Sequence, residues 1–264
     1  MKKILVIGNW KMYVGTRDGA SMLARDIKKL AAKYAWSDMY AAPAFPHIVP
    51  VATALKRTKI RVGAQALAAH ENGAHTGEVS AGMLKDAGAT FCIVGHSERR
   101  ALGEHDAMIR EQVQSALKRG LRVVLCVGER ERDTEHGTHF EYVNVQMRAA
   151  LAGIAPKDAG KIVIAYEPVW AIGKKGEEAV PPKVLRETVI FIRKSLVELF
   201  DRTAALKIPI VYGGSVDEFN IEALFLDGGV QGFLVGRGSV DPVKFGELLA
   251  ALHRAQGVMN AKKK

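Results

Sequence analysis

Short apolar runs rich in β-branched residues alternate along the chain with longer stretches in which apolar residues recur every three or four positions. The longer stretches have the spacing of helices that bury one face, as in Ile109, Val113 and Leu117. The short runs have the length of strands. Eight such runs are predicted, at residues 4–8, 38–42, 60–65, 91–95, 123–127, 162–166, 210–212 and 233–235.

Strands that alternate with helices predict right-handed βαβ units and a parallel sheet. The 264 residues suffice for a closed (β/α)8 barrel, which commonly takes about 250. We therefore expect an α/β protein with a single barrel and a parallel eight-stranded core; a doubly wound open sheet is the competing arrangement. No linker divides the chain, so residues 1–257 are expected to form one domain and residues 258–264 a basic, solvated tail.

Composition narrows the class of protein. Hydrophobic residues make up 48% and charged residues 25%, as in a soluble globular domain. No apolar run approaches the roughly 18 residues of a membrane span, and the run after Met1 ends at Gly8, too early for a signal peptide. We expect a cytoplasmic protein with no membrane partner. Cys92 and Cys126 lie inside predicted strands, without a His/Cys cluster, so no metal site is predicted.

The net charge of +10 is compatible with binding to nucleic acid or with a field that attracts a small anion. No basic run is interleaved with aromatic residues, and Lys262, Lys263 and Lys264 have the composition of a frayed end. We expect no nucleic-acid partner. A barrel that serves only to bind nucleic acid or another protein remains the alternative from a different class.

Glu167 stands where a predicted buried strand ends, because Pro168 cannot donate to a β-ladder. The carboxylate is thus expected at the mouth of the sheet. Trp170 and Ile172 place large apolar side chains on the loop that follows, which suggests a lid. A base beneath a water-excluding lid is one interpretation; a capping or salt-bridged glutamate before an ordinary loop is the other.

Further polar residues follow other predicted strands, at the end where active sites lie in parallel α/β folds. Asn9 and Lys11 follow the first strand, and His96 and Glu98 the fourth. Glycine-rich turns follow the seventh and eighth strands, at residues 213–215 and 236–239. Each feature alone is explained by a surface lysine, a capping histidine, an ion pair or a tight turn. Their convergence on one rim favours a site.

These residue types suit one kind of chemistry. A carboxylate base can abstract a proton next to a carbonyl while an imidazole and an ammonium stabilise the enediolate oxygen. Glycine-rich turns that open into helices present backbone N–H groups to an anion such as phosphate. No nucleotide fingerprint, nucleophile–base pair or metal cluster occurs, and no cofactor is predicted.

A series of motifs stands out in order along the chain: Gly8-Asn-Trp-Lys-Met12, Val94-Gly-His-Ser-Glu-Arg-Arg100, Cys126-Val-Gly-Glu129, Ala165-Tyr-Glu-Pro-Val-Trp-Ala-Ile-Gly173, Tyr212-Gly-Gly-Ser-Val216 and Gly232-Phe-Leu-Val-Gly236. Together they resemble the triosephosphate isomerase family over essentially the whole chain. The resemblance implies interconversion of dihydroxyacetone phosphate and D-glyceraldehyde 3-phosphate through a cis-enediolate, without a cofactor, in glycolysis and gluconeogenesis.

The resemblance also implies a role for each site residue. Glu167 is similar to the family's base and His96 to its electrophile, kept neutral by the helix that begins beside it. Lys11 is similar to the ammonium near the substrate oxygens, assisted by Asn9, with Glu98 behind them. The N–H groups implied to bind phosphate belong to Gly173, Ser215, Gly236 and Arg237.

Two loops take further roles from the resemblance. Trp170 is implied to anchor the lid, with Glu129 as its partner. Gln65 and Thr76 match the loop that enters a neighbouring subunit, which implies a homodimer. The lid residues are Pro168, Val169, Trp170, Ala171, Ile172, Gly173, Lys174 and Lys175.

The chain departs from the family pattern at several points. Arg237 replaces the second of two glycines; we expect its side chain to face solvent, although turned inward it would add charge near the phosphate. The lid ends in Gly173-Lys-Lys-Gly-Glu-Glu178, Ala66 replaces an asparagine, and the loop after Arg100 is one residue short. Because Arg237 and the lid border the substrate, an isomerase of four-carbon ketose phosphates is a second hypothesis.

Overall fold

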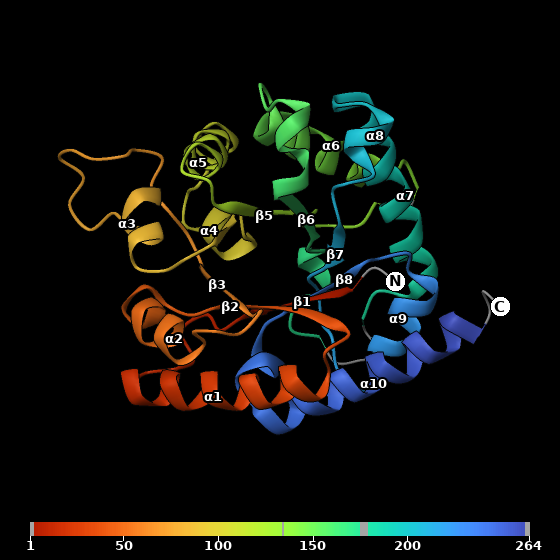
Figure 1. The fold of residues 1–264 in the computed structure, drawn as a ribbon. Helices are drawn as coiled ribbons and strands as arrows, with labels where there is room; N and C mark the ends of the chain where they lie inside the picture. The colour runs from red at the N-terminus through yellow and green to blue at the C-terminus, as the bar shows by residue number, and fades with distance from the viewer. Residues whose placement is uncertain (1–2, 134, 175–178, 262–264) are drawn as a thin grey trace.

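The computed structural model describes residues 3–133, 135–174 and 179–261. Within these residues, parallel strands pair in chain order and close into a barrel when β8 pairs with β1 (Figure 1). The strands are β1 (Ile4–Asn9), β2 (Ser37–Ala42), β3 (Arg61–Ala64), β4 (Phe91–Val94), β5 (Arg122–Val127), β6 (Ile162–Tyr166), β7 (Ile210–Tyr212) and β8 (Gly232–Val235). The closed barrel is confirmed over the open sheet, and every predicted strand is present, with ends that differ by at most one residue.

Helices follow the strands and surround the barrel (Figure 1). The α-helices are α1 (Arg17–Lys33), α2 (Ile48–Ala54), α3 (Ala81–Asp86), α4 (Ser97–Ala101), α5 (Asp106–Lys118), α6 (Thr138–Leu151), α7 (Pro182–Leu199), α8 (Arg202–Ala205), α9 (Ile221–Asp227) and α10 (Pro242–Ala261). Short 3-10 segments are η1 (Phe45–His47), η2 (Pro156–Lys161), η3 (Val169–Ala171) and η5 (Arg237–Val240).

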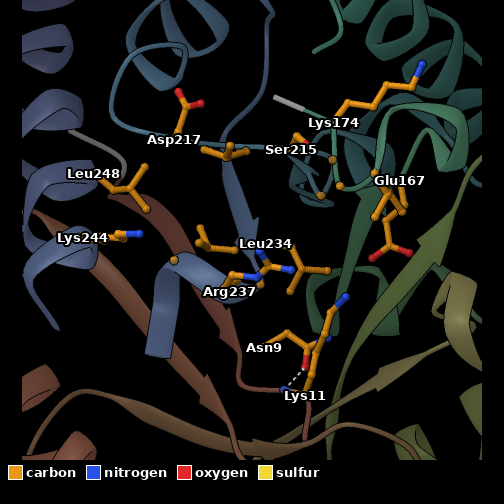
Figure 2. A pocket seen from close by; sticks show the side chains of 18 of the residues that line it. Asn9, Lys11, Glu167, Lys174, Ser215, Asp217, Leu234, Arg237, Lys244 and Leu248 are labelled. Carbon is orange, nitrogen blue, oxygen red and sulfur yellow. Dashed lines mark hydrogen bonds between the residues drawn. The ribbon is translucent and has the colours of Figure 1, made fainter. Parts of the chain in front are cut away.

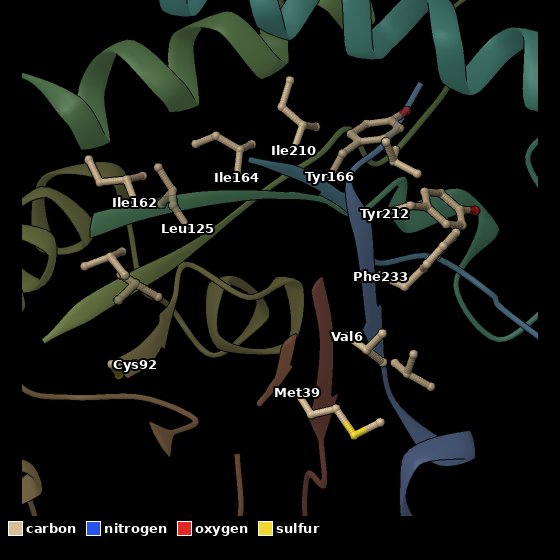
Figure 3. Close-up of a cluster of buried hydrophobic side chains, with 14 of the residues drawn as sticks. Val6, Met39, Cys92, Leu125, Ile162, Ile164, Tyr166, Ile210, Tyr212 and Phe233 are labelled. Atoms are coloured by element: carbon tan, nitrogen blue, oxygen red, sulfur yellow. The ribbon is translucent and has the colours of Figure 1, made fainter. Parts of the chain in front are cut away.

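Alternation along the strands divides the core into two parts. In β6, Ile162, Ile164 and Tyr166 belong to the large cluster between the strands and the helices, whereas Val163 and Ala165 belong to the smaller cluster inside the barrel. Figure 3 shows side chains of the outer cluster. Because side chains alternate, Glu167, two positions after Ala165, continues the inward-facing row at the carboxyl end of the barrel.

The last helix differs from the expected boundary at residue 257. Helix α10 continues through residues 258–261, where a solvated tail was expected. Met259 is partly buried and packs against the outer core, which gives this last turn a reason to stay helical. Residues 262–264 lie outside the described part of the chain.

None of the helices described here is both long enough and apolar enough to cross a membrane. Cys92 and Cys126 are free thiols buried in the core, as the sequence predicts.

Candidate active site

A cavity of about 660 Å³ opens at the carboxyl ends of the strands, and we call it the rim cavity (Figure 2). Loops after β1, β4, β6, β7 and β8 line it. The structure therefore brings together residues that are far apart in sequence. The residues expected in a site that line it are Asn9, Lys11, His96, Glu98, Glu167, Ile172, Gly173, Lys174, Ser215, Gly236 and Arg237.

Glu167 follows β6 in the inward-facing row of Val163 and Ala165. Its side chain is only 2% exposed. One carboxylate oxygen lies 3.3 Å from Nε2 of His96, and the other accepts a hydrogen bond of 3.2 Å from the backbone N–H of Ser97. Burial keeps water away from this carboxylate. That environment favours a role as a general base toward a bound substrate.

His96 is the N-cap of helix α4, and its ring orientation follows from that position. Its Nδ1 accepts a hydrogen bond of 3.2 Å from the backbone N–H of Glu98. A nitrogen that accepts this bond carries no proton, so in the neutral ring the proton is assigned to Nε2, the atom nearest Glu167. The local sequence thus directs an N–H donor toward the interior of the rim cavity.

Lys11 adopts a left-handed backbone conformation, with φ of 45°. Such a conformation costs on the order of 1–3 kcal/mol in a residue with a side chain and persists only when its surroundings hold it. Its N–H donates to Oδ1 of Asn9 at 3.1 Å, and its carbonyl accepts from Nε2 of Gln65 at 2.8 Å. The ammonium reaches Oε1 of Glu98 at 2.6 Å.

Gln65 thus makes hydrogen bonds within its own chain, and its implied place in the loop for a neighbouring subunit stays a prediction. Its Nε2 also donates to the carbonyl of Ala42 at 2.9 Å, which ties the loop after β1 to the end of β2. Thr76 is exposed on the segment between β3 and α3, outside the rim cavity. Figure 1 shows that segment extending away from the barrel.

The turn after β7 is glycine because neighbouring groups leave no room for a side chain. A Cβ on Gly213 would lie 2.9 Å from Cγ of Glu167, and one on Gly214 would overlap the ring of Tyr212. The turn after β8 is less crowded, since a Cβ on Gly236 would lie 3.6 Å from Cε of Lys11. Backbone N–H groups can thus approach a bound anion closely at this side of the cavity.

The lid begins with η3 and is attached at its amino end by Glu129. This buried carboxylate accepts hydrogen bonds from Nε1 of Trp170 at 2.9 Å and from the hydroxyl of Tyr166 at 2.8 Å. Burial and the charge of Glu129 raise the pKa of Tyr166 well above its usual value, so the hydroxyl stays a donor.

The lid also touches the turn after β7, where Oγ of Ser215 donates to the carbonyl of Ala171 at 2.9 Å. Gly173 has φ of 81°, a conformation that favours glycine. Lys174 lines the rim cavity, and Lys175, the last expected lid residue, lies outside the described residues.

Arg132 completes the surroundings of Glu129 and was missed by the sequence reasoning. Its side chain is 11% exposed, and Nη1 lies 3.4 Å from Oε1 of Glu129, 3.4 Å from the Tyr166 hydroxyl and 3.1 Å from Oγ1 of Thr188. Only its position three residues after Glu129 signals this role, since Thr188 lies far away in sequence, on helix α7. Ser97, next to His96, was likewise not singled out as a ligand of Glu167.

Cys126 lies in the inward-facing row of β5, near Glu167. Burial, strengthened by the negative charge of Glu167, raises the pKa of the thiol well above its usual value. A neutral thiol there does not compete with the carboxylate as a base. Within the described ranges, no group of three or more His, Cys, Asp or Glu side chains is arranged to hold a metal ion.

Comparisons with known proteins agree with this geometry. Residues 4–252 match the family model described as "Triosephosphate isomerase". Curated proteins named "Triosephosphate isomerase" are similar over nearly their full length. The one from Thermus thermophilus is 42% identical, over 94% of this chain and 98% of its own, and the one from Carboxydothermus hydrogenoformans is 41% identical, over 93% and 97%. The one from Flavobacterium johnsoniae is 40% identical, over 96% and 100%.

Proposed function

The chain belongs to the triosephosphate isomerase family, and on that premise we propose how its residues interconvert dihydroxyacetone phosphate and D-glyceraldehyde 3-phosphate. The observation that carries the proposal is the buried contact between Glu167 and Nε2 of His96, 3.3 Å apart in a cavity that also holds an ammonium. The reaction belongs to glycolysis and gluconeogenesis. Because it transfers hydrogen within one molecule, it needs no oxidant, reductant or cofactor.

In the proposed mechanism Glu167 removes a proton from C1 of dihydroxyacetone phosphate. The electron pair of the C–H bond forms the C1–C2 double bond, and the carbonyl oxygen becomes the enediolate oxygen. Nε2–H of His96 donates to that oxygen, and the Lys11 ammonium, assisted by Asn9, stabilises the developing charge. Glu98 positions that ammonium through its 2.6 Å ion pair. Proton transfer between the two oxygens and return of the proton from Glu167 to C2 give the aldehyde.

The opposite side of the rim cavity is proposed to bind the phosphate. Backbone N–H groups of Gly173, Ser215, Gly236 and Arg237 are the donors, and the glycine turns allow the close approach that such donors need. The lid, residues 168–175, then excludes water from the enediolate. Its described part already contacts Glu129 and Ser215.

A coupled assay for dihydroxyacetone phosphate formation from glyceraldehyde 3-phosphate tests the assignment, with Glu167→Gln as the control. Loss of a general base lowers rates by on the order of 10²–10⁴-fold, so the variant should be nearly inactive. A four-carbon aldose phosphate assayed in parallel tests the second hypothesis. A large preference for that substrate would replace the triose assignment.

We also propose a homodimer, supported by the loops at the carboxyl ends of β1 and β4. Met12 is 93% exposed and Leu102 76% exposed, and Phe45 in η1 and Met83 in α3 are exposed as well. They follow the consecutive strands β1 to β4, and exposed large apolar side chains on neighbouring segments often mark an interface. The segment that carries Thr76, between β3 and α3, extends away from the barrel (Figure 1). Sedimentation at micromolar concentration tests this; a monomer that is fully active would contradict it.

The remaining expectations concern the whole chain. We propose that residues 1–257 form the catalytic domain, extended by the end of α10. We also propose a cytoplasmic location, because the apolar run at residues 4–8 is a barrel strand paired with both β2 and β8. Fractionation of cells that produce the protein tests the location.

A further inference from the structure

The side chain of Arg237, which was expected to face solvent, is exposed and also borders the rim cavity. Arg237 is the first residue of η5, directly after Gly236 at the end of β8. Figure 2 draws its side chain among the lining residues, with the guanidinium nitrogens directed into the cavity. The residue is exposed because the cavity itself is open.

An aromatic ring holds the guanidinium near this position. The carbon that joins the guanidinium nitrogens lies 6.0 Å from the centre of the Tyr13 ring, on the loop after β1. Contacts of this kind attract a cation to the ring face and leave its N–H groups free to bind in the guanidinium plane. Arg237 therefore bridges the loops after β8 and β1 without using its donors on Tyr13.

Three of the four carboxylates that line the cavity have partners in the structure, and the fourth, Glu218, forms no ion pair with Arg237 among the described residues. Glu98 pairs with Lys11, Glu167 contacts His96, and Asp217 accepts N–H groups of its own turn. Among the residues that the structure describes, no ion pair joins Arg237 to any carboxylate. A guanidinium that pairs with no carboxylate of the described residues, beside two glycine-rich turns, has the geometry that matches two oxygens of a phosphate.

We propose that the side chain of Arg237 binds the phosphate of the substrate, in addition to the backbone N–H groups of the same turn. The inference rests on the proposed function for the identity of the phosphate ester, but not for the binding of phosphate itself. Phosphate is remote from C1 and C2, so this contact is equally strong in the ground and transition states. It should lower KM and leave kcat nearly unchanged.

The test is calorimetric titration of inorganic phosphate into the wild type and the Arg237→Gln variant. A hydrogen-bonded charge pair of this kind changes affinity by about tenfold or more, so the dissociation constant should rise about tenfold. Arg237→Lys keeps the charge but not the planar fork, so its dissociation constant for phosphate should lie between those of the wild type and Arg237→Gln. With glyceraldehyde 3-phosphate, Arg237→Gln should raise KM by a similar factor at nearly constant kcat.

Arg202→Gln is the matched control, because it removes the same charge from α8, which precedes β7 and so lies at the opposite end of the barrel. A shift for Arg237→Gln no larger than that for Arg202→Gln would overturn the proposal. Titration of phosphate needs no turnover, so its outcome is separate from that of the isomerase assay. A wild type that binds phosphate through Arg237 yet fails to isomerise trioses would refute the proposed function alone.

Discussion

The two sides of the rim cavity are built from different parts of the residues. After β1, β4 and β6, side chains provide the chemical groups: an ammonium, an imidazole and a carboxylate. After β7 and β8, the proposed phosphate donors are backbone N–H groups together with the Arg237 side chain, and glycines leave room for a close approach. The side that carries Lys11, His96 and Glu167, which we call the reacting side, should therefore lose activity when a functional group is removed. In the turn after β7, adding a group should also be damaging, because Gly213 and Gly214 leave no room for a side chain.

The largest effect expected from an added group is that of Gly213→Ala, in the turn after β7. The added methyl group would lie 2.9 Å from Cγ of Glu167 and must displace that side chain. A small misplacement of a reacting group can cost on the order of 10²-fold, so kcat should fall by about that factor while phosphate affinity changes little. Steady-state kinetics and phosphate titration separate the two quantities.

Gly257→Ala is the matched control for that substitution, since Gly257 lies in α10 and an added Cβ would meet no atom within 4 Å apart from the adjacent backbone of its own helix. Activity should be unchanged, and the free energy of unfolding should rise by about 0.5–1 kcal/mol, because alanine loses less backbone entropy in a helix. Equal kinetic losses in both variants would mean that crowding against Glu167 is not the cause.

An intermediate effect is expected where the lid joins the reacting side. Trp170→Phe keeps an aromatic ring but removes the N–H that donates to Glu129 at 2.9 Å. Hydrogen bonds to a charged group contribute about 1.5–3 kcal/mol, so kcat/KM should fall about tenfold if lid closure depends on this bond. Trp36→Phe, at a tryptophan that stacks on His253, provides the control and should retain full activity. Unchanged kinetics for Trp170→Phe would show that Glu129 does not control the lid.

The smallest effect is expected for the contact between the lid and the turn after β7. Ser215→Ala removes the hydrogen bond to the carbonyl of Ala171 but keeps the backbone N–H of residue 215. A neutral hydrogen bond contributes about 0.5–1.5 kcal/mol, so kcat/KM should fall only a few-fold. Steady-state measurement of kcat and KM checks this prediction. A loss as large as that of Gly213→Ala would mean that the serine side chain, rather than its backbone, is the essential group.

Most of the fold and the location of the site could be predicted from the sequence, because local signals are strong here. Apolar strands that alternate with one-sided helices define the barrel, and Pro168 marks the end of β6 just after Glu167. Glu167 then follows Ala165 in the inward-facing row. The resemblance to a family supplied the roles.

Several features could not be predicted, because they depend on contacts between distant residues. The strained backbone of Lys11 is held by Gln65, which lies 54 positions away. Arg132 reaches Thr188 across 56 positions, and Arg237 meets Tyr13 from the opposite end of the chain. Periodicity says nothing about such pairs. They decide how the lid and the phosphate side are held.

The most direct test of the division between the two sides is deuterium incorporation into dihydroxyacetone phosphate in D2O by the Glu167→Gln variant at saturating substrate. Exchange at C1 should slow by on the order of 10²–10⁴-fold, because the base that removes the proton is lost. Phosphate affinity should stay at the wild-type value, because the phosphate side of the cavity is intact. Exchange at the wild-type rate would contradict the assignment of Glu167 as the base.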